Sequence, residues 1–236
     1  MRKPNLYKFT QFVPIFIAFA IIGCGLSTTS LDEPMSDALN PANNPLEGIA
    51  AAGAPLNGIV FLKASSSAMT ISTTVDDSGY YIFSDNEIDA IGGTSPYVLK
   101  VEGTLGGEKH VLYSIARSRG RVNLNPISDL ALSLSALNND AGQVFENTSL
   151  IPSQASYENS VTNLKSAIEP LLLSLQLNDI NPITDELKSD GTGFDGIFDL
   201  VKFDSIEGNS GEVTSVVFRD YSGIKLGQTD VNSIGS

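Results

Sequence analysis

Three aspartates in the C-terminal half are the side chains whose type and spacing first suggest a site. Asp190, Asp195 and Asp199 follow one another closely. Clustered carboxylate oxygens are the ligands that calcium prefers. The spacing departs from the EF-hand loop, because Phe194 stands where that loop needs a ligand. Two interpretations follow, a calcium site or a set of side chains that only form turns and caps.

The same segment contains a glycine pattern that resembles a phosphate-binding loop. Residues 191–196 read "GTGFDG", which satisfies G-x-G-x-x-G. The motif binds a pyrophosphate only when it follows a buried strand, whereas the preceding "TDELKS" is polar. The neighbouring aspartates would also repel a pyrophosphate. We expect no dinucleotide site here.

The residue types needed for catalysis are scarce. His110 is the single histidine, and no G-x-S-x-G or H-x-x-E motif occurs in the chain. Nucleophilic and zinc-dependent hydrolysis both require partners that the sequence does not supply. The 27 acidic residues offer many carboxylate pairs for glycoside hydrolysis, but none is singled out. We expect a protein that is not an enzyme and that has no cofactor apart from the calcium option.

Aromatic side chains suggest sugar binding as another chemistry. Flat exposed rings form the platforms on which sugars stack, and the chain has no tryptophan. Tyr80, Tyr97 and Tyr113 are the candidate substitutes, with Tyr157 and Tyr221 as further tyrosines. Tyrosines in strands also serve as half-buried packing residues, so both interpretations stay open.

The first 24 residues have the features of an export signal. Arg2, Lys3 and Lys8 precede the uncharged run "FVPIFIAFAII" at residues 12–22. This run is too short for a membrane-spanning helix, which needs roughly 20 apolar residues. The stretch "IIGC" that ends at Cys24 resembles the lipobox of bacterial lipoproteins, in which an aliphatic and a small residue precede the acylated cysteine.

That resemblance implies a lipid anchor. Cleavage would fall between Gly23 and Cys24, and acyl chains such as palmitate would attach to Cys24 and its new amine. Several chains hold a protein to a membrane, because each buried methylene contributes about 0.8 kcal/mol. Gly25 stands where an aspartate would favour the inner membrane, so we expect the outer membrane of a bacterial envelope. An ordinary secretory signal with a free cysteine is the alternative.

The charge of the remaining chain limits its partners. After removal of the signal, eleven basic residues face 27 acidic ones, a formal charge of −16. Such a chain repels phosphate backbones, so nucleic acid is not expected as a partner. Residues 24–46 are rich in Ser, Thr, Asn and Pro without periodicity, and we expect them to form a disordered tether.

Short β segments follow the tether. They are rich in β-branched and aromatic residues, are separated by turn residues, and have the spacing of a sandwich between residues 47 and 124. In the segment 96–104, Tyr97, Leu99 and Val101 share one face, while Lys100 and Glu102 face solvent. The segment 58–64 is apolar on both faces and is expected to be central. The expected strands are residues 58–64, 69–75, 79–83, 96–104, 109–116 and 121–125.

Two stretches carry a second resemblance. "GAPLNGIVFL" at residues 53–62 and "TTVDDSGYYIF" at residues 73–83 resemble the carboxypeptidase regulatory-like domain, a transthyretin-like sandwich related to starch-binding folds. The second stretch predicts a hairpin that Gly79 closes with a positive φ. Tyr81 and Phe83 then share one face, and we place both in the core. The absence of a zinc-ligand pair separates the chain from the peptidases themselves.

Residues 125–236 predict a small α+β region. "NPISDLAL" at 125–132 and "NPITDELK" at 181–188 both have the composition of a helix start. N-capping is sufficient to explain the recurrence, and an ancient duplication is the alternative. A helix is expected over residues 158–175, divided or bent at Pro170, with its apolar stripe on the sandwich, on the last strands or on a partner. The last strands are expected at residues 200–207, 212–220 and 223–230.

Together these features predict a mainly β protein, a transthyretin/Ig-like β-sandwich followed by a small α+β C-terminal region. Its expected function is that of a non-catalytic, lipid-anchored lipoprotein of the cell envelope that acts as a structural or protein-interaction module. The alternative is a carbohydrate-binding module, suggested only by the likeness to starch-binding folds. Envelope proteins or glycans are the partners that these two functions imply.

Overall fold

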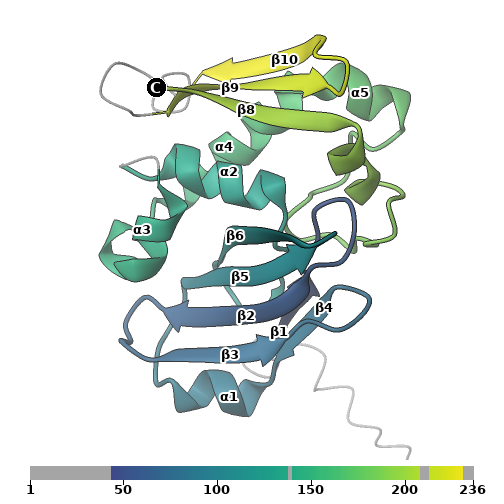
Figure 1. The fold of residues 1–236 in the computed structure, drawn as a ribbon. Coiled ribbons are helices and arrows are strands. Elements are labelled where there is room, and N and C mark those ends of the chain that lie inside the picture. Colours follow the sequence, from purple (N-terminus) through teal and green to yellow (C-terminus); the bar gives the residue numbers. More distant parts are fainter. Residues whose placement is uncertain (1–43, 138–139, 208–212, 231–236) are drawn as a thin grey trace, which may run out of the picture. The chain divides into compact units, whose positions relative to one another are not determined.

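A computed structural model describes residues 44–137, 140–207 and 213–230 (Figure 1). The predicted signal, Cys24 and the first part of the predicted tether lie outside the described residues. The helices are α1 (Asp85–Ala90), α2 (Pro126–Ser135), α3 (Ala141–Glu146), α4 (Gln154–Ala167) and α5 (Glu169–Ser174), with 3-10 turns η3 (Thr148–Leu150) and η4 (Asp195–Asp199). The strands are β1 (Leu46–Ile49), β2 (Asn57–Ala64), β3 (Thr70–Thr74), β4 (Tyr80–Phe83), β5 (Tyr97–Leu105), β6 (Glu108–Ala116), β7 (Gly120–Arg121), β8 (Val201–Glu207), β9 (Val213–Asp220) and β10 (Lys225–Asp230).

The first seven strands form a β-sandwich. One sheet has the order β4-β1-β7 and the other the order β3-β2-β5-β6. Alternate residues of each strand point into the space between the sheets, as the pleat requires. The buried set from β2 and β5 includes Val60, Leu62, Leu99 and Val101, and all four are fully buried. The predicted fold class is confirmed, a β-sandwich followed by a small α+β region.

The tyrosine and phenylalanine of β4 occupy the core, as predicted. Tyr81 and Phe83 are 1% and 0% exposed, and their rings meet edge to face at 6.1 Å. The turn before them contains Gly79 at φ 79°, also as predicted. The expected hairpin is wrong in one respect, because β3 and β4 belong to opposite sheets. The strands separate after the turn because β4 pairs with β1.

The sandwich begins earlier than the sequence pattern predicts. The prediction places Leu46 in the tether, but this residue begins β1 and is fully buried. The strand is only four residues long and contains Gly48, so it carries little periodicity. A Cβ at Gly48 would lie 1.7 Å from the carbonyl oxygen of Val122, which explains why glycine is needed at this position. The predicted strand 121–125 is reduced to β7, with an isolated bridge from Leu124 to Ala50.

The predicted solvent face of β5 is partly covered by a helix that the sequence pattern did not reveal. Lys100 points away from the core, yet its side chain is only 16% exposed. Its Nζ lies 4.8 Å from the ring centre of Phe145 on α3 and 4.8 Å from that of Phe61 on β2. Helix α3 therefore covers part of the outer face of the four-stranded sheet. Strand β2 is central as predicted, but Ile59 stays 43% exposed on this face.

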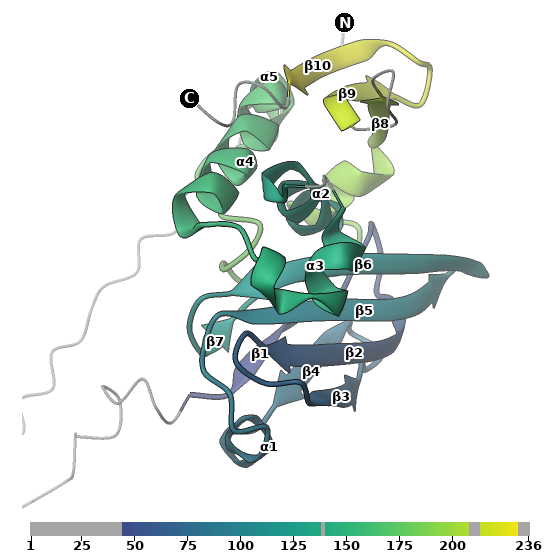
Figure 2. The ribbon, with the colours of Figure 1, turned by 90° about the vertical axis from the view of Figure 1, so that its left-hand side faces the viewer.

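Helices connect the sandwich to the last three strands. Helix α2 packs on β6 and on α4, and α4 packs on β10 (Figure 2). The predicted helix 158–175 is divided at Pro170 as expected, since α4 ends at Ala167 and α5 begins at Glu169. The three last strands form the antiparallel sheet β10-β9-β8. Gly227 of β10 lies so close to α4 that a Cβ there would be 1.6 Å from the carbonyl oxygen of Ala167.

The two similar phrases at 125–132 and 181–188 have different structures. Asn125 caps α2, accepting hydrogen bonds from the amides of Ile127 and Ser128. Asn181 forms only a single turn closed by the Asp185 amide, so the prediction of a second helix start is wrong. The two phrases contact each other, because Asn125 Nδ2 donates to the carbonyl of Pro182 at 2.8 Å. This contact uses Asn125 for tertiary packing as well as for capping.

Candidate functional site

The three aspartates of the predicted calcium site differ in their exposure and in their hydrogen bonds. Asp190 is exposed, and hydrogen bonds from Thr192 lower the pKa of its carboxyl group. Asp195 is 2% exposed, and burial raises the pKa of its carboxyl group. Its two oxygens accept from the amides of Gly53 at 3.0 Å and Gly191 at 3.3 Å. The side chain thus fastens the 191–199 segment to the loop that precedes β2.

These contacts match the turn-and-cap interpretation of the aspartates. Within residues 44–137, 140–207 and 213–230, no group of three or more His, Cys, Asp or Glu side chains is placed to hold a metal ion. Asp199 lies beside Gly53, where a Cβ would come within 2.3 Å of its Oδ1. The calcium option stays a prediction without support from the described geometry.

The three candidate sugar-binding tyrosines do not share a surface. Tyr97 is 4% exposed in the core. Tyr80, on the other sheet, donates its hydroxyl to Glu47 at 2.6 Å, and this bond raises its pKa to about 12. Tyr113 is half-buried on β6, with its ring 6.2 Å from that of Phe145. A platform built from these three rings together is therefore not formed.

His110 is half-buried on β6, next to Leu105, Glu108 and Tyr221 in a shallow hollow. Its position on β6 confirms the strand predicted for residues 109–116. All helices of the described residues are too short or too polar to cross a bilayer.

Helix α2 covers one edge of the four-stranded sheet at Tyr113 of β6. The main-chain N–H of Tyr113 on β6 donates to Asp129 Oδ1 at 3.2 Å, and the hydroxyl of Ser128 donates to the Tyr113 carbonyl at 2.8 Å. Both main-chain groups point away from β5, because Tyr113 pairs with Lys100 at a position without direct main-chain bonds. Two side chains of α2 thus occupy both outward main-chain groups of Tyr113, where an added strand would otherwise bind.

The opposite edge of the same sheet is open in the part of the chain that the structure describes. The amide of Val75 donates to the carbonyl of Gly58 at 3.0 Å. Val75 and Gly58 therefore form a hydrogen-bonded pair. Bonded and non-bonded pairs alternate along an antiparallel ladder, so Thr74, Ser72 and Thr70 occupy non-bonded positions, and their main-chain N–H and C=O groups point away from β2. All three residues are exposed. Nothing among the described residues forms a hydrogen bond to this side of β3.

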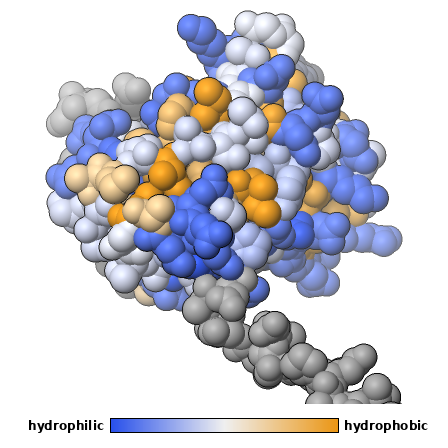
Figure 3. Space-filling view, turned by 90° about the horizontal axis from the view of Figure 1, so that it is seen from below, coloured by the Kyte–Doolittle hydropathy of each residue, from blue (hydrophilic) through white to orange (hydrophobic). Residues whose placement is uncertain are grey.

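The open edge also lacks the features that usually protect a sheet edge. Exposed edges are normally blocked by lysines, prolines or bulges. Strand β3 reads "TISTT", with no charge and no proline, and its pairing with β2 is regular over five residues. Figure 3, seen from the side of α1 and β3, shows apolar residues in several separate groups between hydrophilic ones. The distinctive feature of this region is therefore its main-chain donors and acceptors.

The sequence contained part of the signal for this edge. The uncharged, β-branched composition of residues 70–74 is visible in the sequence, and the strand itself was predicted. Its place at the end of the sheet order was not visible, because that place depends on which strands β2 and β5 select as neighbours.

Comparison with protein-family models, with curated proteins and with solved structures finds no match to this chain. The resemblances to the lipobox and to the carboxypeptidase regulatory-like domain therefore stay predictions from the residues that carry them.

Proposed function

We propose that this chain is a non-catalytic, lipid-anchored protein of the cell envelope that binds an extended segment of another protein at the open edge of β3. The single observation that carries the proposal is the contrast between the two edges of one sheet. Side chains of α2 occupy the outward main-chain groups of Tyr113 in the middle of β6, whereas no outward main-chain group of β3 has a partner among the described residues. An exposed edge of this kind accepts an added strand, with affinity supplied by main-chain hydrogen bonds.

The charge of the chain favours a foreign strand over a second copy of β3. The formal net charge of the full chain is −13, and Asp76 and Asp77 lie two and three residues after the end of β3. Two copies placed edge to edge would bring like charges together, which opposes association. A neutral or basic extended segment meets no such repulsion. We therefore propose an uncharged or lysine-flanked segment as the occupant.

The anchor is supported by the order of residues before the described part. A basic start, a short apolar run and "IIGC" lead to Cys24, and we propose that acyl chains on this residue hold the protein in the outer membrane. Expression of the full chain with labelled palmitate, followed by membrane fractionation, tests this part. The Cys24→Ser variant is expected to lose both the label and the membrane association. Equal membrane association of the two chains would contradict the anchor.

The edge is tested with a defined peptide. The probe is an acetylated peptide of three Thr-Val pairs flanked by lysines, added to the full chain in detergent micelles. We expect amide chemical-shift changes at Thr70, Ser72 and Thr74. The same peptide methylated on alternate main-chain nitrogens is expected not to bind, because methylation removes the N–H donors along the side of the peptide that would face β3.

Matched variants make this test specific. Ser72→Pro removes an outward N–H but leaves the ladder to β2 intact, since proline is tolerated on edge strands. It is expected to abolish the shifts, whereas Ser72→Thr retains them. Equal binding of the methylated peptide, or unchanged binding by Ser72→Pro, would contradict the proposal. Binding of glycans on an array in place of the peptide would favour the carbohydrate-binding alternative instead.

A further inference from the structure

A cavity of about 430 Å³ lies at the junction of β6, α4 and the segment 181–184. This volume is in the range of sites for small molecules. Its wall contains buried apolar and aromatic side chains from three parts of the chain, which are Ile115, Val122, Tyr157, Val161 and Ile183. The cavity does not include β3 or any residue of the open edge.

The charged residues of this cavity have the opposite sign to the chain as a whole. Arg117, Arg121 and Lys165 line it, and Glu158 is the one acidic residue of its lining among the described residues. The full chain has 14 basic and 27 acidic residues. Three of the basic residues thus gather around one small apolar space. Such an arrangement produces a locally positive potential that attracts anions.

Arg117 lacks a carboxylate partner in the described residues. Its Nη2 donates to the carbonyl of Pro152 at 2.6 Å, and its Nε is buried without a hydrogen-bond partner. Among the described residues Arg117 forms no ion pair, and the charge of Glu158 acts on it only at longer range. Burial lowers the pKa of the Arg117 guanidinium. A guanidinium that is half-buried and not neutralised has capacity left for an anionic ligand.

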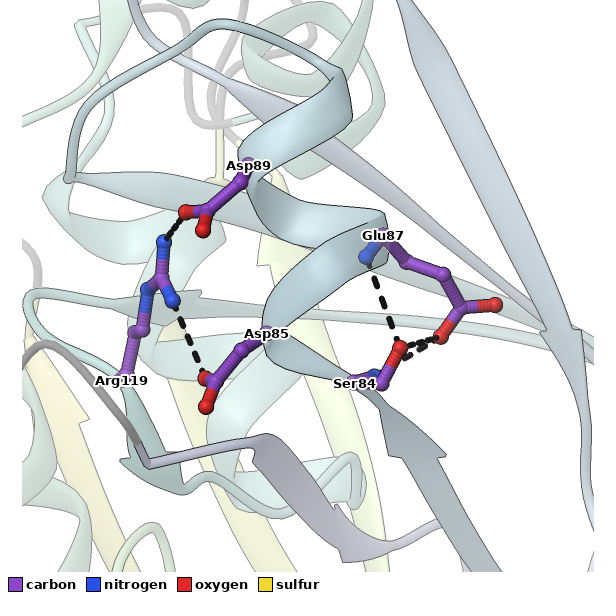
Figure 4. Close-up of polar contacts among 5 residues, drawn as sticks. All are labelled: Ser84, Asp85, Glu87, Asp89 and Arg119. Atoms are coloured by element: carbon purple, nitrogen blue, oxygen red, sulfur yellow. Dashed lines mark hydrogen bonds and ion pairs between the residues drawn. The ribbon is translucent and has the colours of Figure 1, made fainter.

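Arg119, in contrast to Arg117, has its charge neutralised by carboxylates of the same chain. Arg119, two residues away, forms ion pairs with Asp85 and Asp89 of α1, with a distance of 3.0 Å to Asp85 (Figure 4).

The two further cations of the cavity, Lys165 and Arg121, are only partly neutralised by nearby groups. Lys165 donates to the carbonyls of Asn178 and Ile180, which carry no charge. Arg121 lies 3.8 Å from Glu47, whose other oxygen accepts from Tyr80.

We propose that this cavity binds a small organic carboxylate with an apolar body. The carboxylate lies toward Arg117, with Arg121 and Lys165 adding positive charge, and the apolar body contacts Val161 and Ile183. Planar guanidinium groups bind carboxylates through paired hydrogen bonds, and an apolar wall contributes affinity in proportion to the buried area. The site is independent of strand binding at β3.

A pair of matched probes tests the proposal. Phenylpropionate carries the charge, and phenylpropionamide has the same shape without it. Calorimetric titration of the full chain in detergent micelles is expected to show binding of phenylpropionate and at least about ten-fold weaker binding of the amide, the difference that a charge-assisted hydrogen bond makes. Equal affinity for both probes would overturn the proposal. Displacement of phenylpropionate by inorganic phosphate at the same concentration would overturn the choice of a carboxylate.

Variants locate the site. Arg117→Gln is expected to weaken phenylpropionate binding about ten-fold, and Lys109→Gln, an exposed cation outside the cavity, is expected to leave it unchanged. Glu158→Gln removes the opposing charge from the exposed side of α4, so it is expected to tighten binding while the fold is preserved. Each variant is compared with the parent only where its circular-dichroism spectrum shows the parent fold. Unchanged binding in folded Arg117→Gln, or weaker binding in folded Glu158→Gln, would contradict the proposal, and either variant is sufficient for the test if the other unfolds.

Discussion

The amide of Tyr113 donates to the carboxylate of Asp129 at 3.2 Å, and this contact joins the last strand of the four-stranded sheet to the first helix of the C-terminal part. It occupies an edge that would otherwise be available to a foreign strand. The contact also holds the half-buried carboxylate of Asp129 against the sheet. Burial raises the pKa of Asp129 to about 7, and the nearby charge of Asp140 adds to the effect.

The raised pKa predicts a pH-dependent stability. The folded chain holds a proton on Asp129 up to about pH 7, whereas the unfolded chain releases it near pH 4. The folded state therefore binds more protons in this interval, so the contribution of Asp129 to stability falls as pH rises from about 4 to about 7. Asp129→Asn keeps an oxygen for the Tyr113 amide and removes the charge. We expect it to raise the free energy of unfolding at pH 8 by on the order of 2 kcal/mol relative to the parent.

Urea unfolding of both chains at pH 4 and pH 8 measures this effect. The gain at pH 8 is expected to shrink or disappear at pH 4, where the parent carboxyl group is protonated. Glu186→Gln, at an exposed position, is the control and is expected to change neither value. An equal effect of Asp129→Asn at both pH values would contradict the ionisation argument.

The ion pairs of Arg119 predict a structural role for this side chain. Its side chain is 13% exposed, and its guanidinium contacts Asp85 and Asp89, which raise its pKa against the effect of burial. Arg119→Met leaves both carboxylates without their cation, and we expect a loss of about 1–3 kcal/mol in the free energy of unfolding. Arg219→Met is the matched control, because the pair with Asp204 is exposed on both sides. Exposed pairs contribute little, so a change of less than about 1 kcal/mol is expected there.

The close approach of Gly227 to Ala167 predicts an intolerance to a methyl group. The added Cβ would overlap a main-chain oxygen of α4, which cannot move without displacing the helix. Gly227→Ala is expected to cost about 1–3 kcal/mol or more and to lower the thermal midpoint. In Gly142→Ala the nearest atom is a side-chain oxygen 3.1 Å away, so we expect a much smaller effect. Similar midpoints for the two variants would show that the last sheet is not held this closely on α4.

The contact between the two Asn-Pro-Ile segments predicts that Asn125→Ala and Asn181→Ala lower the free energy of unfolding by different amounts. Asn125 is 2% exposed, caps α2 and donates to Pro182, so Asn125→Ala loses a cap and a buried hydrogen bond. We expect a loss of about 2–3 kcal/mol. Asn181 is exposed, and among the described residues its side chain accepts only from Ile183 within its own turn, so Asn181→Ala is expected to cost less than about 1 kcal/mol. Denaturant unfolding measures both, and equal costs would contradict the tertiary role of Asn125.

Local patterns in the sequence were sufficient for most of the strands. Alternation and turn residues indicated β2 to β6 and the three last strands, and they placed Tyr81 and Phe83 in the core. Each of these features depends on the preferences of adjacent residues. The short elements β1, α1 and α3 span only four to six residues and contain too few periods to be recognised.

The candidate sites depended much less on local pattern. Residues 70–74 were predicted as a strand, but the sequence did not show that this strand would end the sheet. Tyr80, Tyr97 and Tyr113 looked alike in the sequence, and they differ in the structure because their strands take different places. Arg117 carried no signal, since its surroundings come from Pro152, from α4 and from the segment 181–184.

The sequence by itself determined the class of the fold, the positions of the longer strands and the acidic character of the chain, because these follow from composition and from neighbouring residues. Only the tertiary structure decided that β3 and β4 enter opposite sheets, that α2 binds the edge of β6 at Tyr113 while the edge of β3 has no partner among the described residues, and that three cations meet around one cavity. Those features arise from contacts between residues far apart in the chain. Such contacts are selected by the burial and pairing of the whole molecule, which no local pattern contains.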